Sequence, residues 1–478
     1  MPQKKDFIKI NDYLWEVPKS FRRDMRVPAR AYVSEKMLEE ALKDRSLEQL
    51  INVATLPGIV HHSMAMPDMH EGYGFPIGGV AAMDVKTGVI SPGGVGYDIN
   101  CGMRLLKSEY TQDDIKPYLE GLATEIQKEV PSGLGRGRKI KVDINSLNKI
   151  LKEGAQGLVE QGYGEKEDIE NCEAGGRLEN ADSSIVSDRA KDRGRDQVGT
   201  LGSGNHFLEI QKVGEIFDEK VTEVFGLFKN QVVIMIHTGS RGLGHQIATD
   251  YIRLMMKAMP KYDIELPDRE LAACPFNSPE GQRYFSAMAS GANFAWANRQ
   301  MITHYIRKTW KLVLGGKSSS LTSLYDVAHN IAKIEKYPEG TEVIVHRKGA
   351  TRAFPPGHPE IPEKYREVGQ PVIIPGSMGT ASYVLAGAET GKETWHSTCH
   401  GAGRAMSRHQ AVRTIDAKEL VNKLQNKGIL VKSWSLRGIA EEAPQAYKDI
   451  DSVVDVVHNA GLSKKVARLI PLAVIKRE

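Results

Sequence analysis

Short runs of hydrophobic residues recur along this chain, and the clearest ones end in loops that contain glycine. Residues 231–236 (QVVIMI), 342–345 (EVIV) and 371–374 (PVII) have the length and composition of buried strands. Residues 80–90 alternate weakly around residues 86–88 (KTG), which predicts a β-hairpin. Strand ends that open into glycine loops are common positions for ligand-binding backbone, so we expect the chemistry of the protein there.

Apolar residues at helical spacing occupy the stretches between these loops. They predict helices over residues 34–56, 112–128, 143–160, 246–259, 291–310 and 417–426. Because strands and helices follow one another in mixed order, the expected fold class is α+β or mixed α/β. Residues 162–198 are polar, charged and poor in apolar periodicity, which predicts a mobile or substrate-ordered excursion on the surface.

Composition narrows the class of protein. The chain has 478 residues, 41% hydrophobic and 26% charged, which excludes a mainly disordered chain, a collagen-like fibre and a coiled-coil rod. Its four cysteines do not make a disulfide framework, and its net charge of +4 permits a polyanionic partner without requiring one. The N-terminus lacks the apolar region of a secretory signal, and the longest apolar runs, about five residues, are far below the ~20 that span a bilayer. We therefore expect a soluble, cytoplasmic protein without a membrane partner.

A carboxylate, a thiol and three imidazoles stand in the glycine loops or at the ends of predicted strands. They belong to Asp98, Cys101, His206, His237 and His329. This donor set suits a transition metal such as Zn²⁺, Mn²⁺, Co²⁺ or Fe²⁺, and one thiolate can bridge two ions. The residues are scattered, however, without CxxC or HExxH spacing. A second interpretation therefore stays open, in which the histidines are buried polar groups satisfied by loop backbone.

Two glycine loops, residues 375–380 (PGSMGT) and 400–404 (HGAGR), have the composition of an anion-binding turn made by successive backbone N–H groups. Neither matches a Walker loop. Residues 316–318 (GKS) come near one, but Lys311 stands where that motif needs its first glycine. For any one of these loops alone, a plain tight turn is the more frequent explanation.

Basic residues gather near the same loops. Two runs lie at residues 136–141 and 189–195, and further cations stand in or beside the glycine loops: Arg241, Arg347, Lys348, Arg352, Arg404 and Arg408. Guanidinium groups bind phosphate in bidentate fashion, so the pattern suits a nucleotide or a nucleic acid. A solvated surface explains the two runs well and explains the arginines between glycine and histidine less well.

The most informative motifs follow one another in a fixed order. They are PDMHEGYGFPIGG, GYDINCG, GSGNHFLE, HTGSRGLGHQ, DVAHN, HRKGATRA, PGSMGTASYVL and CHGAGRAMSR. Together they closely resemble the RtcB family of RNA ligases, over nearly the whole chain. The resemblance implies one compact domain over residues 1–478, a monomer of mixed α/β type with mixed sheets flanked by helices.

The resemblance also implies an activity. The family joins an RNA end that bears a 2′,3′-cyclic phosphate or a 3′-phosphate to a 5′-hydroxyl end, in tRNA splicing and RNA repair. It uses GTP and two Mn²⁺ ions, and archease is an activating partner for some members. His400 aligns with the nucleophile that carries GMP before GMP passes to the RNA 3′-phosphate as an anhydride.

The family's other site residues also have counterparts in this chain. The implied metal ligands are Asp98, Cys101, His206, His237 and His329, with Cys101 shared by both ions. The implied guanylate contacts are Asn205, His206, Phe207, Leu208, Glu209, His329, Asn330, Pro375, Gly376, Ser377, Met378, Ser382, His400, Gly401, Ala402, Gly403 and Lys476. Residues aligned with RNA or phosphate contacts are Asp68, Arg241, Arg404 and Arg408. Cys172, Cys274 and Cys399 receive no role.

Two other functions compete with ligation. A metal-dependent phosphoesterase that only hydrolyses cyclic phosphate would explain the metal ligands and the arginines, but it leaves His400 without work. A non-catalytic RNA-binding protein with a structural metal would predict that replacing His400 changes nothing. Structural zinc sites usually contain more than one cysteine, which speaks against that alternative.

Overall fold

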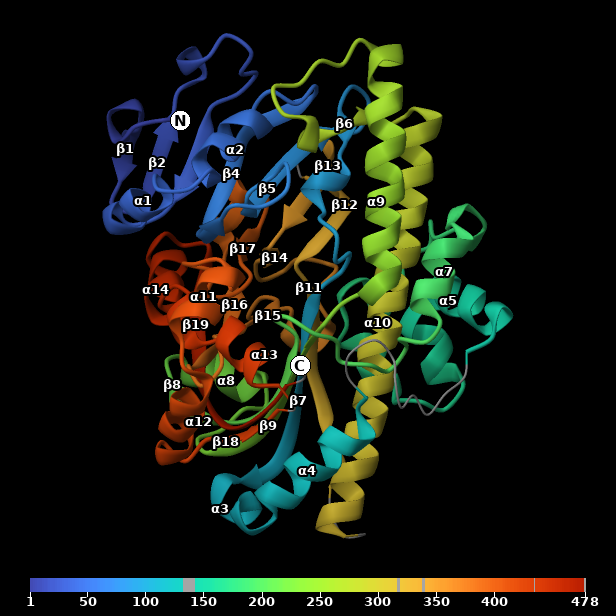
Figure 1. Cartoon of the computed structure of the whole chain (residues 1–478), viewed down its shortest axis with the longest axis vertical. Helices are drawn as coiled ribbons and strands as arrows, with labels where there is room; N and C mark the ends of the chain where they lie inside the picture. The colour runs from blue at the N-terminus through green and yellow to red at the C-terminus, as the bar shows by residue number, and fades with distance from the viewer. Residues whose placement is uncertain (132–141, 316–318, 338–339, 434, 477–478) are drawn as a thin grey trace.

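Two large sheets form the framework of the computed structural model, which describes residues 1–131, 142–315, 319–337, 340–433 and 435–476 (Figure 1). The first sheet has the order β1 (Ile8–Asn11), β2 (Leu14–Val17), β3 (Ala29–Tyr32), β4 (Ile59–His70), β5 (Ile77–Asp84), β13 (Glu342–Lys348) and β12 (Asn330–Lys336). Its neighbouring strands are antiparallel except β3 and β4, which are parallel.

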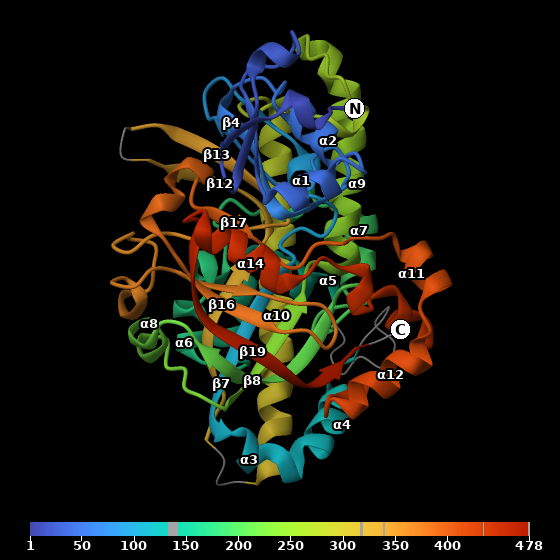
Figure 2. The same ribbon diagram turned by 90° about the vertical axis from the view of Figure 1, so that its left-hand side faces the viewer.

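The second sheet lies below the first in the view of Figure 2. Its order is β11 (Thr322–Ala328), β7 (Gly102–Thr111), β9 (Gln231–Thr238), β8 (Phe207–Ile216), β19 (Ser463–Ile475), β16 (Ser382–Gly387) and β15 (Pro371–Ile374), and β18 (Leu430–Lys432) pairs with β19. Two short ladders join β6 (Val89–Ile90) to β10 (Cys274–Pro275) and β14 (Ala350–Arg352) to β17 (Ser397–Cys399). Each large sheet combines strands from distant parts of the sequence, as expected for one mixed α/β domain.

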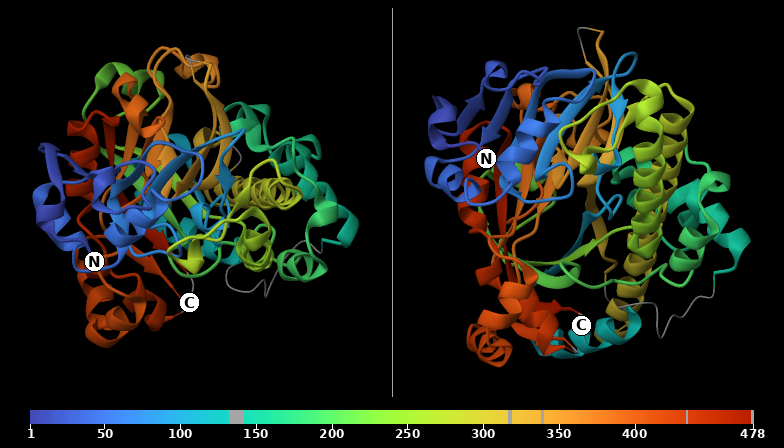
Figure 3. Two further views of the ribbon diagram at one scale, coloured as in Figure 1. Left: turned by 90° about the horizontal axis from the view of Figure 1, so that it is seen from above. Right: turned by 45° about the horizontal axis from the view of Figure 1, so that its top comes forward.

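Helices cover these sheets. Within the described ranges they are α1 (Glu35–Ala41), α2 (Ser46–Val53), α3 (Gln112–Ile115), α4 (Leu119–Glu129), α5 (Ile144–Glu160), α6 (Lys166–Glu170), α7 (Asp188–Gly194), α8 (Glu219–Val224), α9 (Arg241–Ala258), α10 (Pro279–Leu314), α11 (Arg408–Thr414), α12 (Ala417–Asn426), α13 (Leu436–Glu441) and α14 (Ile450–Asn459). The long helices α9 and α10 run side by side along one flank (Figures 1 and 3). None of the helices described here has both the length and the apolar character that crossing a bilayer needs.

All six predicted helical stretches are confirmed, although three of them are broken, the one over residues 143–160 by a kink at Gly154. Residues 34–56 form α1 and α2, and residues 112–128 form α3, a short 3-10 turn and α4. Helix α10 is longer than predicted: Ser278 caps it by accepting a hydrogen bond from the Gly281 N–H at 3.1 Å, and Pro279 occupies its first turn. The polar residues of its first turns hid that start from the apolar pattern.

The predicted hairpin over residues 80–90 is wrong. The turn exists, because Asp84 Oδ1 accepts hydrogen bonds from the backbone of Lys86 and Thr87 at 3.0 and 2.8 Å. The strands on its two sides do not pair, however, since β6 pairs with β10. Strand β5 already has β4 on one edge and β13 on the other, which leaves no free edge for β6.

Residues 162–198 differ from the surface excursion that their polarity predicts. Asp168 is fully buried and forms an ion pair with Arg307 at 2.6 Å, and buried Glu173 forms one with Lys333 at 2.7 Å. These pairs anchor α6 and the turn after it against α10 and β12. Apolar periodicity cannot reveal such an anchor, because the anchoring side chains are themselves charged. The mobility of this segment stays a prediction.

Candidate active site

The candidate metal ligands meet where the two sheets join. Cys101 directly precedes β7, His206 directly precedes β8, and His237 lies on β9. The register pairs Gly102 with Thr238 and Phe207 with His237, which places these three ligands at one end of adjacent strands. His329 stands between β11 of the second sheet and β12 of the first. Residues far apart in sequence therefore converge because their strands are neighbours in the sheet.

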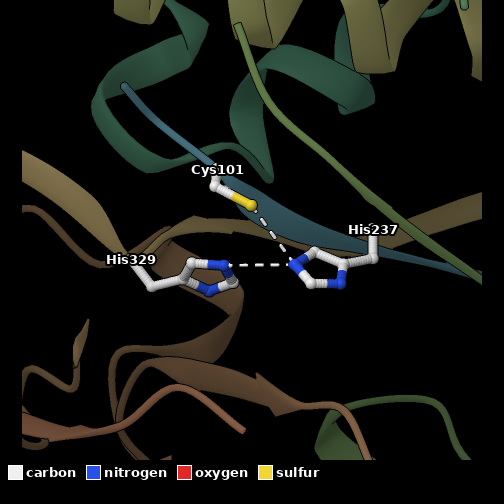
Figure 4. A group of neighbouring side chains, drawn as sticks. All are labelled: Cys101, His237 and His329. Carbon is white, nitrogen blue, oxygen red and sulfur yellow. Dashed lines mark hydrogen bonds between the residues drawn. The ribbon is translucent and has the colours of Figure 1, made fainter. Parts of the chain in front are cut away.

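The ligand atoms form two groups that share one sulfur. Cys101 Sγ lies 3.3 Å from His237 Nε2, which lies 3.3 Å from His329 Nε2 (Figure 4). On the other side, the same sulfur lies 3.5 Å from His206 Nε2, which is 2.8 Å from Asp98 Oδ2. Within each group all ligand atoms lie within 4.8 Å of one another. The sulfur of Cys101 is thus placed to bridge two ions.

The protonation of these side chains fits a pair of divalent transition-metal ions. Burial and the neighbouring imidazoles hold the pKa of His237 and of His329 well below its usual value, so both rings are neutral donors. Burial acts to raise the pKa of Asp98, but His206 outweighs it and lowers that pKa to about 2. Burial and the Asp98 charge raise the pKa of the Cys101 thiol, so metal binding there must release a proton.

A single arginine of α10 ties the two ligand strands together. Arg299 is fully buried and donates to the carbonyl oxygens of Asn100 at 2.9 Å and Thr238 at 2.8 Å. Each carbonyl belongs to a residue adjacent to a candidate metal ligand, Cys101 or His237. The guanidinium also forms an ion pair with buried Asp326 at 2.8 Å. Arg299 therefore fixes the spacing of the ligand backbone without touching the ligand atoms.

His400 follows β17 and faces the same site. Its Nδ1 lies 2.5 Å from Asp68 Oδ2, which also accepts from the backbone N–H groups of His400 at 2.9 Å and Gly401 at 3.2 Å. Its ring centroid is 5.2 Å from that of His329. Burial raises the pKa of Asp68, but His400 reverses the shift and lowers it, so the carboxylate stays charged. With Nδ1 bound to Asp68, Nε2 is the nitrogen left for chemistry.

A cavity of about 460 Å³ opens over His400 and the ligand atoms. Its lining contains most of the predicted guanylate and phosphate contacts: Asn205, Phe207, Glu209, Asn330, Pro375, Gly376, Ser377, Met378, Gly401, Ala402, Gly403, Arg404, Arg408 and Lys476. Five predicted contacts lie outside that lining: Asp68, His206, Leu208, Arg241 and Ser382. Asp68 holds His400, and His206 belongs to the first ligand group. The Leu208 side chain points into the core, because Phe207 and Glu209 occupy the opposite face of β8. Ser382 accepts from Gly376 N–H at 3.1 Å and shapes the loop, and Arg241 donates to Thr200 at 3.3 Å.

One end of the cavity is built from buried charged groups. Burial raises the pKa of Glu209 to about 8, and burial lowers the pKa of Lys476 to about 8. Glu442, 2% exposed, lies 3.3 Å from Arg404, 3.4 Å from Arg408 and 3.9 Å from Lys476. This end can recognise a polar base edge and an anionic group together.

The sequence missed several lining residues. Tyr73 and Tyr97 lie inside the recognised motifs but received no role, while Glu442 and Tyr447 lie outside every motif. Glu442 had no local signal, because its position depends on how the C-terminal helices fold back. The sequence did contain a signal for the tyrosines, because both are aromatic residues in glycine motifs that also contain predicted site residues.

The unassigned cysteines and the basic runs lie apart from the ligand groups. Cys172, Cys274 and Cys399 are buried free thiols, and burial raises the pKa of each. The run at residues 189–195 forms α7 and the residue after it. The run at residues 136–141 and the near-Walker segment at 316–318 fall outside the described residues.

Comparisons with known proteins identify the family of this chain. A model of the family "tRNA-splicing ligase RtcB" matches residues 49–477. The tRNA-splicing ligase RtcB of Thermococcus kodakarensis is 55% identical over 474 residues, 98% of each chain, and that of Archaeoglobus fulgidus is 54% identical over the same shares. The RNA-splicing ligase RtcB of Mycobacterium tuberculosis is 52% identical over 434 residues, 90% of this chain and 100% of the relative. Since the site residues span positions 68 to 476 and the family match includes all of them, the chain belongs to the tRNA-splicing ligase RtcB family.

Proposed function

We propose that this protein is a GTP- and Mn²⁺-dependent RNA ligase. It joins a 2′,3′-cyclic phosphate or 3′-phosphate end to a 5′-hydroxyl end, in tRNA splicing and RNA repair. The observation that supports this most is the placement of His400: its Nδ1 is held by Asp68 at 2.5 Å, and its ring stands 5.2 Å from that of His329 in the same cavity. A hydrolase would not need a nucleophile held in this way beside the ligands.

The first step is transfer of GMP to the protein. His400 Nε2 attacks the α-phosphorus of GTP, a P–N bond forms, and the bond to the oxygen that bridges the α- and β-phosphates breaks, so pyrophosphate leaves. The ring becomes positively charged, and the Asp68 carboxylate at Nδ1 stabilises that charge. A phosphoramidate is labile, so His400 can leave again in the next step.

The metal ions belong to the two ligand groups. Asp98, Cys101 and His206 would hold one ion, and Cys101, His237 and His329 the other. When bound, two Mn²⁺ ions would neutralise phosphate charge and polarise the phosphoryl group. Cysteine and histidine ligands generally bind Zn²⁺ more tightly than Mn²⁺, so geometry and supply select the metal.

The remaining steps transfer GMP to RNA and then release it. An oxygen of the RNA 3′-phosphate attacks the phosphorus on His400, and the P–N bond breaks to give an RNA–GMP anhydride. The 5′-hydroxyl oxygen then attacks the 3′-phosphorus, loses its proton and displaces GMP. A cyclic phosphate is first hydrolysed to a 3′-phosphate. Arg404 and Arg408, which line the cavity, offset charge on the phosphate oxygens.

Guanine selection is assigned to the charged end of the cavity. Glu209 can accept from the N1–H and the 2-amino group of guanine, and Lys476 can donate to its O6. Adenine presents the opposite pattern at those positions, and a buried site that leaves its polar groups unpaired rejects the wrong base strongly. Archease as activator, the monomeric state and the cytoplasmic location remain expectations from the family.

Labelling with α-³²P-GTP tests the proposal. Incubated with Mn²⁺, the protein should acquire an acid-labile, alkali-stable label, and a 3′-phosphate RNA should remove it as an RNA–GMP product. Unlabelled protein that still hydrolyses cyclic phosphate would indicate the phosphoesterase instead. Unlabelled protein that binds RNA without changing it would indicate the non-catalytic alternative.

A further inference from the structure

The cavity is also lined by two tyrosine rings with no role in the steps above. Tyr73 and Tyr97 both line the cavity and are half-buried. Their ring centroids are 5.4 Å apart at an interplanar angle of 66°. Buried Lys348 donates to the carbonyl oxygens of Tyr73 and Phe75, which fixes the backbone that presents these rings. These hydrogen bonds therefore hold the backbone that carries the aromatic rings in place.

The rings continue from the cavity to the surface. Tyr97 stacks on His245, with centroids 4.7 Å apart and planes 26° from parallel. His245 is the fifth residue of α9 and is exposed. Burial and the nearby Arg193 charge lower the pKa of His245, so the ring is uncharged at neutral pH. An exposed neutral ring at the end of a stack is a platform for another flat ring.

Positive charge flanks this platform. Arg193 of α7 donates to Gln246, the residue after His245, at 2.9 Å. A Cβ added to Gly242 would lie 3.3 Å from the Arg193 Cβ, so α7 and the first turn of α9 are in close contact. Arg189 stands one turn before Arg193, and both are exposed. A phosphate backbone that leaves the cavity over His245 would pass both guanidinium groups.

We propose that single-stranded RNA leaves the reacting centre over this surface, with one base stacked on His245 and the phosphates beside Arg193 and Arg189. This inference rests on the proposed function, because it takes RNA as the substrate. Stacking accepts any base, since every base has an aromatic face, so the subsite would hold RNA without reading its sequence. A peptide would not need both a flat ring platform and two adjacent guanidinium groups.

Two variants of His245 separate stacking from other roles of this residue. Binding of a 3′-phosphate single-stranded RNA, measured by fluorescence anisotropy, should weaken on the order of 10-fold in His245→Ala and be retained in His245→Phe. His61→Ala is the matched control, because His61 is also exposed and stacks on an aromatic ring, that of Trp395 at 5.4 Å, outside the cavity lining. It should bind RNA as the native protein does.

Abasic RNA locates the stacked base. Removing one base at successive positions from the 3′-end should weaken binding to the native protein at one position, and His245→Ala should be insensitive to that removal. Equal RNA affinity of the native protein and His245→Ala, or an equal loss in the Phe and Ala variants, would overturn the stacking site. GMP labelling is measured in parallel. Its absence from the native protein would overturn the proposed function, whereas normal labelling with unchanged RNA affinity in His245→Ala overturns only this inference.

Discussion

The charged residues and the aromatic residues of the cavity would recognise their partners by different interactions. Glu209, Glu442 and Lys476 are each less than 5% exposed and carry charge or polar hydrogens in a fixed arrangement. By contrast, Tyr97 is half-buried and His245 is exposed, and both offer flat faces. A buried polar group that loses its partner costs about 1–3 kcal/mol, whereas a ring face tolerates any base.

This difference matches what each group of residues has to select. An enzyme that consumes one particular nucleotide needs a site that excludes the other nucleotides. Buried charged groups exclude them, because a wrong base would leave those groups without hydrogen-bond partners. An enzyme that joins many RNA ends needs a site that accepts all bases, and exposed rings with adjacent arginines supply that tolerance. His400 and most of the candidate metal ligands line the same cavity as both groups of residues, so changes there should affect both partners together.

The largest effect should come from His400. His400→Ala should abolish GMP labelling and ligation, because among the described residues His400 is the one imidazole of the cavity lining that is paired with a buried carboxylate. Asp68→Asn keeps the shape but should lower the labelling rate by about 10²–10⁴, since an amide cannot stabilise the ring charge. Label retained in His400→Ala would show that the wrong histidine was assigned. A collapsed melting curve would mean that His400 also supports the fold.

The next largest effect should come from Arg299, which acts on both partners through the metal ligands. Arg299→Lys keeps the charge but cannot reach the Asn100 and Thr238 carbonyls together, so metal affinity should fall roughly 10–100-fold. Titration with Co²⁺, followed by its thiolate absorption band, measures this without activity. Arg104→Lys is the matched control, because Arg104 is equally buried and pairs with the same Asp326 at 2.8 Å. If both variants lost metal affinity equally, Arg299 would have only a structural role.

Glu209→Gln should affect guanylate recognition alone. Below about pH 8 the buried Glu209 carboxyl holds a proton, which guanine must displace before both oxygens can accept. The amide of glutamine cannot ionise in this way, so kcat/KM for GMP labelling should fall about 10-fold. RNA affinity should stay unchanged, because Glu209 is buried whereas the proposed RNA surface at His245 is exposed. A parallel loss of RNA affinity would mean that guanylate recognition and RNA recognition are not independent.

The raised pKa of Glu209 also predicts a smaller effect, a change of folding stability with pH. The pKa of Glu209 is raised by burial from 4.5 to about 8, so between these values the folded state holds a proton that the unfolded state has lost. Stability must therefore fall as pH rises from about 4.5 through 8. Lys476, whose pKa is lowered to about 8, acts only above that window. The Tm advantage of Glu209→Gln over the native protein should grow between pH 5 and pH 8, and a constant difference would contradict the assignment.

The sequence predicts those site residues that lie at strand ends, because a strand and the residue after it are neighbours in the chain. Residues 231–236 predict a buried strand, and His237 follows directly, so its place at a strand end needed no tertiary information. Its partners did, because the order β11-β7-β9-β8 is not the order of the chain. The motif resemblance, not periodicity, connected them. Glu442 was invisible to both, since its contacts with three cations arise only when α13 folds back over the cavity.

Substitutions on the basic face of α7 should have the smallest effect. They should change RNA binding alone, which separates the RNA surface from the nucleotide site. Arg189→Gln with Arg193→Gln removes two exposed guanidinium groups beside His245. For single strands each lost phosphate contact should reduce the slope of log affinity against log salt by about 0.7, so the double variant should bind RNA with a shallower slope. Arg195→Gln is the control, since Arg195 already lies 3.9 and 4.0 Å from Asp192 and Asp196. GMP labelling should not change, because no residue of α7 lines the cavity. An equal loss of labelling would place α7 in the nucleotide site and contradict the separation of the nucleotide site from the RNA surface.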